Sequence, residues 1–192
     1  MINKPKDWVF SDPRLKELRQ DYAAYTEEDF NVWKILFDRQ MPNLPKAASK
    51  AYLEGVKAVN FTAERIANFE ELNEVLAKTT GWQVHVVPGL IDDDLFFGLM
   101  NNKRFPSSTW LRKMEQLDYL EEPDMFHDAF AHMPLLTNRH YVDFLEKLSG
   151  IALKHIQDPW AIQLLSRIYW FTIEFPENGV PKKFKSHFSL KR

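Results

Sequence analysis

The chain has 192 residues, of which 45% are hydrophobic and 14% aromatic, so it is long enough for one domain with a large core. Its formal charge of −2 argues against capture of nucleic acid by a basic face, and its lack of cysteine excludes disulfides, thiolate metal sites and cysteine nucleophiles. No apolar run reaches the roughly 18 residues that span a bilayer, and the N-terminus lacks the apolar stretch of a signal peptide, so we expect a cytoplasmic protein with no nucleic-acid or membrane partner.

Helix signals dominate the first half of the chain. Ser11-Asp12-Pro13 is typical of a helix start, with a capping residue before a proline in the first turn, and predicts a helix near Arg14. A capping box that opens at Thr26 predicts a second helix, which Pro42 and Pro45 end. The remaining helices of this half are expected after Pro45 and over 68–78.

The second half mixes one clear strand with further helices. Residues 82–87 are rich in β-branched side chains and lie between Gly81 and Pro88-Gly89, which predicts a strand. Residues 101–120 should be irregular, with a short extended piece near 109–111. Helices are expected over 92–100, 124–135, 140–153 and 159–174. The predicted fold class is therefore mainly α, a single domain with a few short β-strands.

Two histidines, His127 and His132, lie close together in one predicted helix. Five residues of an ideal helix turn through about 500°, which leaves the two side chains roughly 140° apart. Both imidazoles can reach one ion only if the helix starts irregularly or contains a wide, π-type turn, and such turns often occur at functional sites. Packed, hydrogen-bonded histidines with no metal remain the alternative on spacing alone.

Glu174 is the candidate for a third, carboxylate ligand. It is the single acid in the apolar run 169–175, where a carboxylate is costly unless it is paired with a cation or a metal. A partly exposed glutamate at a helix end is the alternative. Two imidazoles and one carboxylate form the facial triad of Fe(II) oxygenases, but Zn²⁺ accepts the same ligands. A zinc hydrolase would need a general base, and although the motif His-Glu-x-x-His is absent, Asp128 could serve.

The segment from Asp118 to Leu136 resembles the iron-binding core of the pterin-dependent aromatic amino acid hydroxylases, most closely the single-domain bacterial phenylalanine 4-hydroxylases. The likeness continues upstream through Thr79–Trp82, Val87–Leu90 and Phe105-Pro106, and downstream to Tyr169–Phe175. It covers roughly residues 30–175. The organisation that it implies is one catalytic-type domain over 1–192, with an N-terminal helical extension at 1–29, a family-like core at 30–175 and a divergent tail at 176–192.

The resemblance implies an iron centre at His127, His132 and Glu174. In the family, Fe(II) and a tetrahydropterin, which is tetrahydrobiopterin or a related compound, together activate O₂ for hydroxylation of an aromatic ring. The protein positions the ring, the pterin and the iron, while the cofactors carry the chemistry.

The resemblance also implies a substrate site. Arg112 matches the arginine that binds the α-carboxylate of the amino acid, to which a guanidinium can donate two parallel hydrogen bonds. Asp124 matches the acid that orients this arginine, and a surface ion pair is the alternative for the two. Pro123 and Trp170 match apolar walls around the substrate ring.

A pterin site is implied by a third group of residues. Gly89, Leu90 and Ile91 match the pterin-binding loop, and Phe96 matches the ring that stacks on the pterin. Asp128 stands where the family has an acid near the pterin and its water. The alternative for Asp128 is an ordinary acid on a helix surface.

The sequence departs from the family pattern in three places. Ala131 stands where the family usually has Gly, and Leu120 where some members have a Thr that contacts the substrate backbone. After Phe175 the family continues with a segment rich in Gly and Ser that closes the substrate pocket, whereas this chain has Pro176 and ends at Arg192. A proline favours extended geometry in the residue before it.

These observations predict an iron- and tetrahydropterin-dependent monooxygenase, most similar to one that converts phenylalanine to tyrosine. The divergent tail leaves open a truncated homologue that binds iron or a pterin with little or no catalysis. A helical interaction domain with structural histidines is the third possibility. The long heptad helix with which some relatives tetramerise is not found, so we expect a monomer or a dimer.

Overall fold

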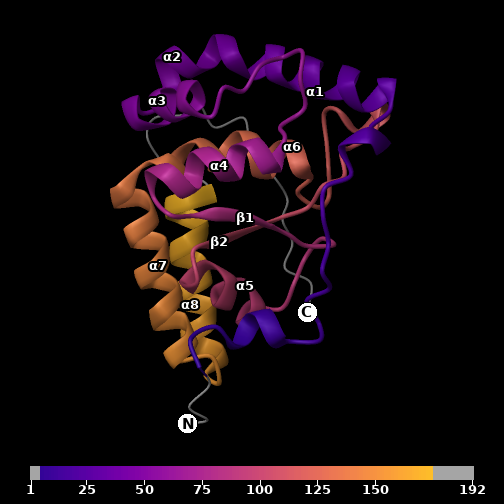
Figure 1. The fold of residues 1–192 in the computed structure, drawn as a ribbon. Coiled ribbons are helices and arrows are strands. Elements are labelled where there is room, and N and C mark those ends of the chain that lie inside the picture. Colours follow the sequence, from indigo (N-terminus) through magenta and orange to yellow (C-terminus); the bar gives the residue numbers. More distant parts are fainter. Residues whose placement is uncertain (1–4, 175–192) are drawn as a thin grey trace.

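Helices surround a small two-stranded sheet in the computed structural model, which describes residues 5–174 (Figure 1). The α-helices are α1 (Glu27–Gln40), α2 (Leu44–Ala47), α3 (Lys50–Ala58), α4 (Phe69–Thr79), α5 (Asp93–Asn101), α6 (Met125–His127), α7 (Arg139–Lys154) and α8 (Pro159–Tyr169). The strands are β1 (Gln83–Val86) and β2 (Arg104–Ser107). Wider π-helical turns span Asp128–His132 and Trp170–Glu174. The fold is therefore mainly α with few strands, as predicted.

The helices are arranged around the sheet in groups (Figure 1). Helices α1, α2 and α3 form a layer at the top of the view, and α4 lies between this layer and the sheet. Helices α7 and α8 stand side by side along the left edge. Helix α5 connects β1 to β2, which pair in parallel from Gln83 with Arg104 to Val86 with Ser107, and it packs against α7. Within residues 5–174, every helix is too short or too polar to cross a membrane.

The N-terminal segment differs from the prediction, because no helix forms near Arg14. Residues 12–21 run without helix between two short 3₁₀ turns, Trp8–Ser11 and Tyr22–Ala24. The Arg14 guanidinium binds the carboxylates of Asp12, Asp92 and Asp94 at 2.9, 2.8 and 2.7 Å. These bonds tie the segment to the start of α5 rather than to a helix of its own.

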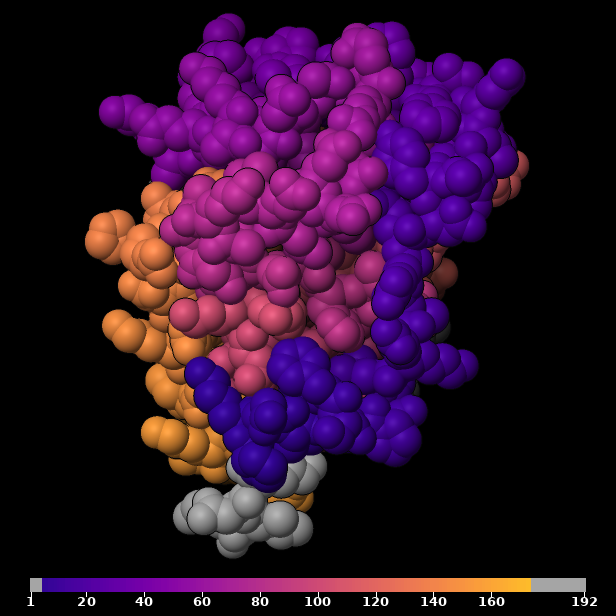
Figure 2. Space-filling view, in the orientation of Figure 1, coloured from indigo at the N-terminus to yellow at the C-terminus, as the bar shows by residue number. Residues whose placement is uncertain are grey.

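The same segment also contributes to the core. Figure 2 shows it in indigo, lying across the lower part of the visible face, where α5 lies in Figure 1. The side chain of Val9 is fully buried and packs with Val87, Leu95 and Leu99 in a small second core cluster. The segment thus covers the end of β1 and one side of α5.

Capping residues set most helix starts, as the sequence indicates. The Thr26 hydroxyl accepts from the N–H of Asp29 at 3.3 Å, and the Asp29 carboxylate accepts from the N–H of Thr26 at 2.8 Å, which completes the predicted capping box. The single helix expected after Pro45 is wrong. Pro45 lies in the first turn of the short α2, and Ser49 caps a separate α3 by accepting from the N–H of Tyr52.

Strand β2 lies in the region that was predicted to be irregular, upstream of the extended piece expected near 109–111. It contains Pro106, which pairs in register with His85. A proline has no N–H for a sheet ladder, so it is tolerated mainly in edge strands. Both strands of a two-stranded sheet are edge strands, and this explains why Pro106 does not prevent pairing.

The histidine segment is anchored in the main core. Met125, Phe126, Ala129 and Phe130 are all buried there. The rings of Phe126 and Phe130 stack at 5.1 Å between centroids, and Trp33 from α1 meets the ring of Phe126 edge-on at 5.2 Å. The segment that carries both histidines is therefore held by packing from several helices.

Candidate metal centre and substrate site

The helix that carries the two histidines changes type within a few residues. Helix α6 ends at His127, the π-helical turn Asp128–His132 follows, and a 3₁₀ turn spans Met133–Thr137. The Nε2 atoms of His127 and His132 lie 3.2 Å apart, and their ring centroids are separated by 5.1 Å. Of the two arrangements expected, an irregular helix start or a wide turn, the wide turn is present, and it brings together two side chains that an ideal helix would keep apart.

The two imidazoles fit a metal ion by their separation and their chemistry. Two metal–nitrogen bonds of about 2.0–2.1 Å that meet at one ion place their nitrogens within about 4.2 Å of each other. The observed 3.2 Å satisfies this limit, although it also suits a hydrogen bond between two neutral imidazoles. His132 is buried, at 2% exposed, and the ring of Phe105 on β2 packs against it with centroids 5.4 Å apart.

Asp124 connects the segment that carries the two histidines to Arg112. Its side chain is fully buried, and its carboxylate accepts from Arg112 Nε at 2.8 Å and from Arg112 Nη2 at 2.9 Å. It also accepts from the backbone N–H of Arg112 and from that of His127, both at 3.0 Å. One carboxylate therefore fixes the direction of the guanidinium and caps the helix that carries the first histidine.

Asp128 lies between the two histidines in the chain and is partly buried. The N–H of Ser108, which follows β2, donates to its carboxylate at 3.1 Å. Burial raises the pKa of Asp128 above its usual value, and the nearby imidazoles of His127 and His132 oppose this shift. The side chain is thus oriented towards the sheet rather than outward, which argues against an ordinary surface acid.

The residues predicted to bind a pterin follow β1. Gly89 adopts a φ of +156°, a value that residues with a side chain rarely adopt. The next residue, Leu90, is 66% exposed. Ile91 is partly buried and packs against the small second core cluster. Phe96 in α5 meets Tyr169 of α8 edge-on at 5.4 Å between centroids, so the predicted pterin ring partner lies beside the residue that precedes Trp170.

Three further predicted residues lie at the ends of elements. Pro123 is partly buried and directly precedes Asp124, and Trp170 is partly buried and opens the second wide turn. Glu174 closes that turn, but its side chain lies outside the described part of the molecule, as do Phe175, Pro176 and the tail at 176–192. Among the described side chains, no three acidic or histidine groups gather around one point. The role of Glu174 stays a prediction.

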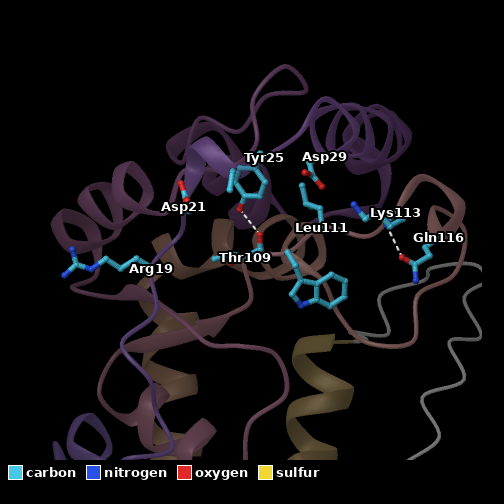
Figure 3. Close-up of a pocket in the computed structure, with 10 residues that line it drawn as sticks. Arg19, Asp21, Tyr25, Asp29, Thr109, Leu111, Lys113 and Gln116 are labelled. Carbon is cyan, nitrogen blue, oxygen red and sulfur yellow. Dashed lines mark hydrogen bonds between the residues drawn. The ribbon is translucent and has the colours of Figure 1, made fainter.

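An open cavity of about 520 Å³ lies between the segment 19–29 and the segment 109–116 (Figure 3). It is bordered by Arg19, Asp21, Ala24, Tyr25, Asp29, Thr109, Trp110, Leu111, Lys113 and Gln116. The Tyr25 hydroxyl donates to the carbonyl of Thr109 at 2.7 Å along its edge. None of the predicted metal, substrate or pterin residues is among these lining residues, so we do not assign the cavity to them.

Sequence patterns missed three residues that contact the histidine segment, which spans Met125–His132. They are Phe105 of β2, whose ring packs on His132, Ser108, whose backbone N–H donates to Asp128, and Tyr52, whose hydroxyl donates to the carbonyl of Phe130. All three are distant in the chain from the histidines. For Tyr52 a local signal did exist, because Pro134 removes the N–H that the carbonyl of Phe130 would bond in an α-helix.

Residues 18–187 match the model of the family described as biopterin-dependent aromatic amino acid hydroxylase. The chain belongs to this family. It is 42% identical over 158 residues to the phenylalanine-4-hydroxylase of Ralstonia nicotianae and 43% identical over 160 residues to that of Chromobacterium violaceum. Each alignment covers 82% of this chain, but only 50% and 53% of the relative.

Solved structures of this hydroxylase family agree with the sequence matches. The cobalt-bound phenylalanine hydroxylase of Chromobacterium violaceum matches with a TM-score of 0.79 and 38% identity, over 90% of this chain and 63% of that chain. A structure of the same enzyme with bound iron(III) and 7,8-dihydrobiopterin also matches with a TM-score of 0.79, at 39% identity, over 90% of this chain and 64% of that chain. The chain spans about half the length of the curated relatives that it matches.

Proposed function

We propose that this chain is an iron- and tetrahydropterin-dependent monooxygenase that hydroxylates an aromatic amino acid, with phenylalanine as substrate and tyrosine as product. The observation that carries the proposal is the facing pair of imidazole nitrogens, 3.2 Å apart, in a segment whose buried acid Asp124 also holds Arg112. Two of the matched structures support it, since one contains bound cobalt and the other contains bound iron(III) and 7,8-dihydrobiopterin.

In this proposal, His127, His132 and Glu174 hold Fe(II), which supplies O₂ activation together with a bound tetrahydropterin. Arg112 binds the carboxylate of the amino acid, and Asp124 keeps the guanidinium in one orientation through two charge-assisted hydrogen bonds. Pro123 and Trp170 exclude water from the substrate ring. Gly89, Leu90, Ile91 and Phe96 bind the pterin, and Asp128 contacts the pterin or its water.

Binding without turnover is the alternative, in which the chain would hold iron or a pterin through the same residues. The monomeric or dimeric state and the cytoplasmic location stay predictions.

Metal analysis followed by a turnover assay tests both possibilities. The purified chain is loaded with Fe(II) without oxygen, and the iron content is measured for wild type, His127→Ala and His132→Ala. His140→Ala, at an exposed position in α7, is the matched control. Reduced pterin, O₂ and phenylalanine are then added, and tyrosine formation is followed, with tyrosine and tryptophan as parallel substrates.

The outcomes separate the hypotheses. One iron per wild-type chain, lost in both site variants but kept in the control, together with turnover near the enzyme median of about 10 per second, supports the monooxygenase. Full iron loading with no hydroxylated product supports the binding homologue. Equal metal content in wild type and the site variants would mean that the histidines are structural and would reject the iron centre.

A further inference from the structure

The carbonyl of Phe130 is a special acceptor within the first wide turn. In an α-helix it would accept from the N–H four residues later, but that residue is Pro134, which has no N–H. The N–H of Met133 bonds instead to the carbonyl of Ala129. Phe130 is buried, and a buried carbonyl needs a hydrogen-bond partner. The carbonyl of Phe130 thus lacks its α-helical donor, and it accepts a hydrogen bond from outside its own helix.

Tyr52 of α3 supplies that donor. Its hydroxyl donates to the carbonyl of Phe130, although the two residues lie 78 positions apart in the chain. The side chain of Tyr52 is buried, and its ring meets that of Phe130 at 6.3 Å between centroids. Burial raises the pKa of Tyr52, so the phenol stays protonated and remains a donor.

Gly55 explains how α3 comes so close to the turn. A Cβ at this position would collide with the carbonyl of Pro134, which lies in the 3₁₀ turn directly after His132. Residues three apart lie on the same face of a helix, so Tyr52 and Gly55 meet the metal segment together. Helix α3 thus packs its backbone at Gly55 against Pro134, just after the wide turn, and its Tyr52 donates a hydrogen bond to Phe130 within the turn.

We propose that Tyr52 is a positioning residue of the metal centre. Its hydroxyl replaces the N–H that Pro134 lacks, and it thereby holds the wide turn in the shape that points the imidazole of His132 at that of His127. The proposal deepens the proposed function, since it rests on the iron centre. It assigns α3 the task of fixing the distance between the two imidazoles before a metal binds.

The test compares two variants that each remove a single hydroxyl. Tyr52→Phe removes the donor to Phe130 and keeps the ring. Tyr22→Phe is the matched control, because the Tyr22 hydroxyl donates to the carbonyl of Ile66 at 3.0 Å and contacts neither histidine. The affinity for Co²⁺ is measured by absorption and by calorimetry. Loss of a partner that orients metal ligands costs about 10–100-fold in affinity, and we expect about tenfold for Tyr52→Phe and no change for Tyr22→Phe.

A second measurement does not need the metal. Hydrogen exchange at the amides of residues 130–133 should be faster in metal-free Tyr52→Phe than in wild type, and unchanged in Tyr22→Phe. Equal Co²⁺ affinity of wild type and Tyr52→Phe would overturn the proposal, as would equal losses in both variants. If wild type itself does not bind Co²⁺, the iron centre is rejected together with the proposal for Tyr52. Unchanged hydrogen exchange in Tyr52→Phe overturns the proposal for Tyr52 and leaves the iron centre standing.

Discussion

The two wide turns of the molecule have the same length and type but different surroundings. Asp128–His132 is enclosed: Tyr52 donates to its backbone, Phe105 packs on its last residue, and Ser108 donates to its first. Trp170–Glu174 lies at the end of α8, where Phe171 is 62% exposed and Thr172 is also exposed. Each turn ends at a residue predicted to bind the metal.

The difference shows which neighbouring elements hold each turn in its shape. A π-type turn is rare as an isolated structure, so it needs support from neighbouring elements. The first turn receives this support from α3, from β2 and from Asp124, which precedes it, and the imidazole of His132 at its end faces that of His127 at 3.2 Å between the Nε2 atoms. The second turn has a local bond, from the Thr172 hydroxyl to the carbonyl of Ile168 at 2.6 Å. Within residues 5–174, the first turn therefore has more contacts from distant elements, and we predict that it is the more rigid of the two.

The largest expected effect comes from the buried acid that anchors the first turn. Asp124→Ala removes the acceptor of four hydrogen bonds and leaves the guanidinium of Arg112, which is 14% exposed, without its carboxylate. Breaking a buried ion pair costs about 3–5 kcal/mol, and urea denaturation should show a loss of this size. Asp118→Ala is the control, because the bond from Asp118 to Arg39 is on the surface and should cost less than about 1 kcal/mol. Similar losses in both would remove the basis for calling the first turn anchored.

The next effect tests the close approach of α3. Gly55→Ala places a Cβ against the carbonyl of Pro134, and overpacking of this kind costs about 1–3 kcal/mol. Gly150→Ala in α7 is the control, since its Cβ would meet the side-chain oxygen of Asn101 at 3.2 Å, where the side chain can move. Thermal unfolding should separate the two variants. A neutral Gly55→Ala would mean that α3 does not press on the turn.

A smaller effect concerns the sheet, whose Phe105 packs against His132. Burial, aided by the positive charge of Arg104, lowers the pKa of His85 below its usual 6.5. His85 therefore binds a proton more readily in the unfolded chain than in the folded protein. Its neutral form contributes fully to the free energy of unfolding above pH 6.5, and this contribution is lost as the pH falls through the lower folded pKa. Between about pH 7.5 and 5.5, wild type should lose more unfolding free energy than His85→Gln. Parallel pH profiles would contradict this.

The smallest effect is expected in the second turn. Thr172→Ala removes a hydroxyl that donates to a backbone carbonyl, as Tyr52→Phe does, but at an exposed position. We expect a change within about 0.5 kcal/mol, against about 1–3 kcal/mol for Tyr52→Phe, which leaves a buried carbonyl unsatisfied. Chemical denaturation of the two variants measures both. Equal costs would show that the two turns are braced to the same extent.

Local signals were enough to predict much of the fold and part of the site. Thr26, Asn68 and Asp158 each cap a helix as their position before an apolar run indicates. For His127 and His132 to share one ion, their spacing called for an irregular helix start or a wide turn, and a wide turn is present. These features depend on residues a few positions apart, so the sequence alone carries the information.

Features that depend on distant residues could not be predicted in the same way. Ser11-Asp12-Pro13 has the form of a helix start, yet Arg14 binds acids some 80 positions away and the helix does not form. Strand β2 contains a proline, and only its pairing with β1 makes it a strand. The role of Tyr52 likewise depends on how α3 packs, which local patterns do not describe.

The missing N–H of Pro134 has a consequence for how the family can change. At most helix positions the backbone satisfies its own carbonyls, so the side chains of other elements are free to vary. Here the carbonyl of Phe130 accepts from one hydroxyl on a different helix. The loss of stability on substitution of Tyr52 therefore depends on whether residue 134 is a proline, and the reverse also holds. Positions 52 and 134 should therefore covary among relatives. A relative with an ordinary residue at 134 has no need of a tyrosine at 52.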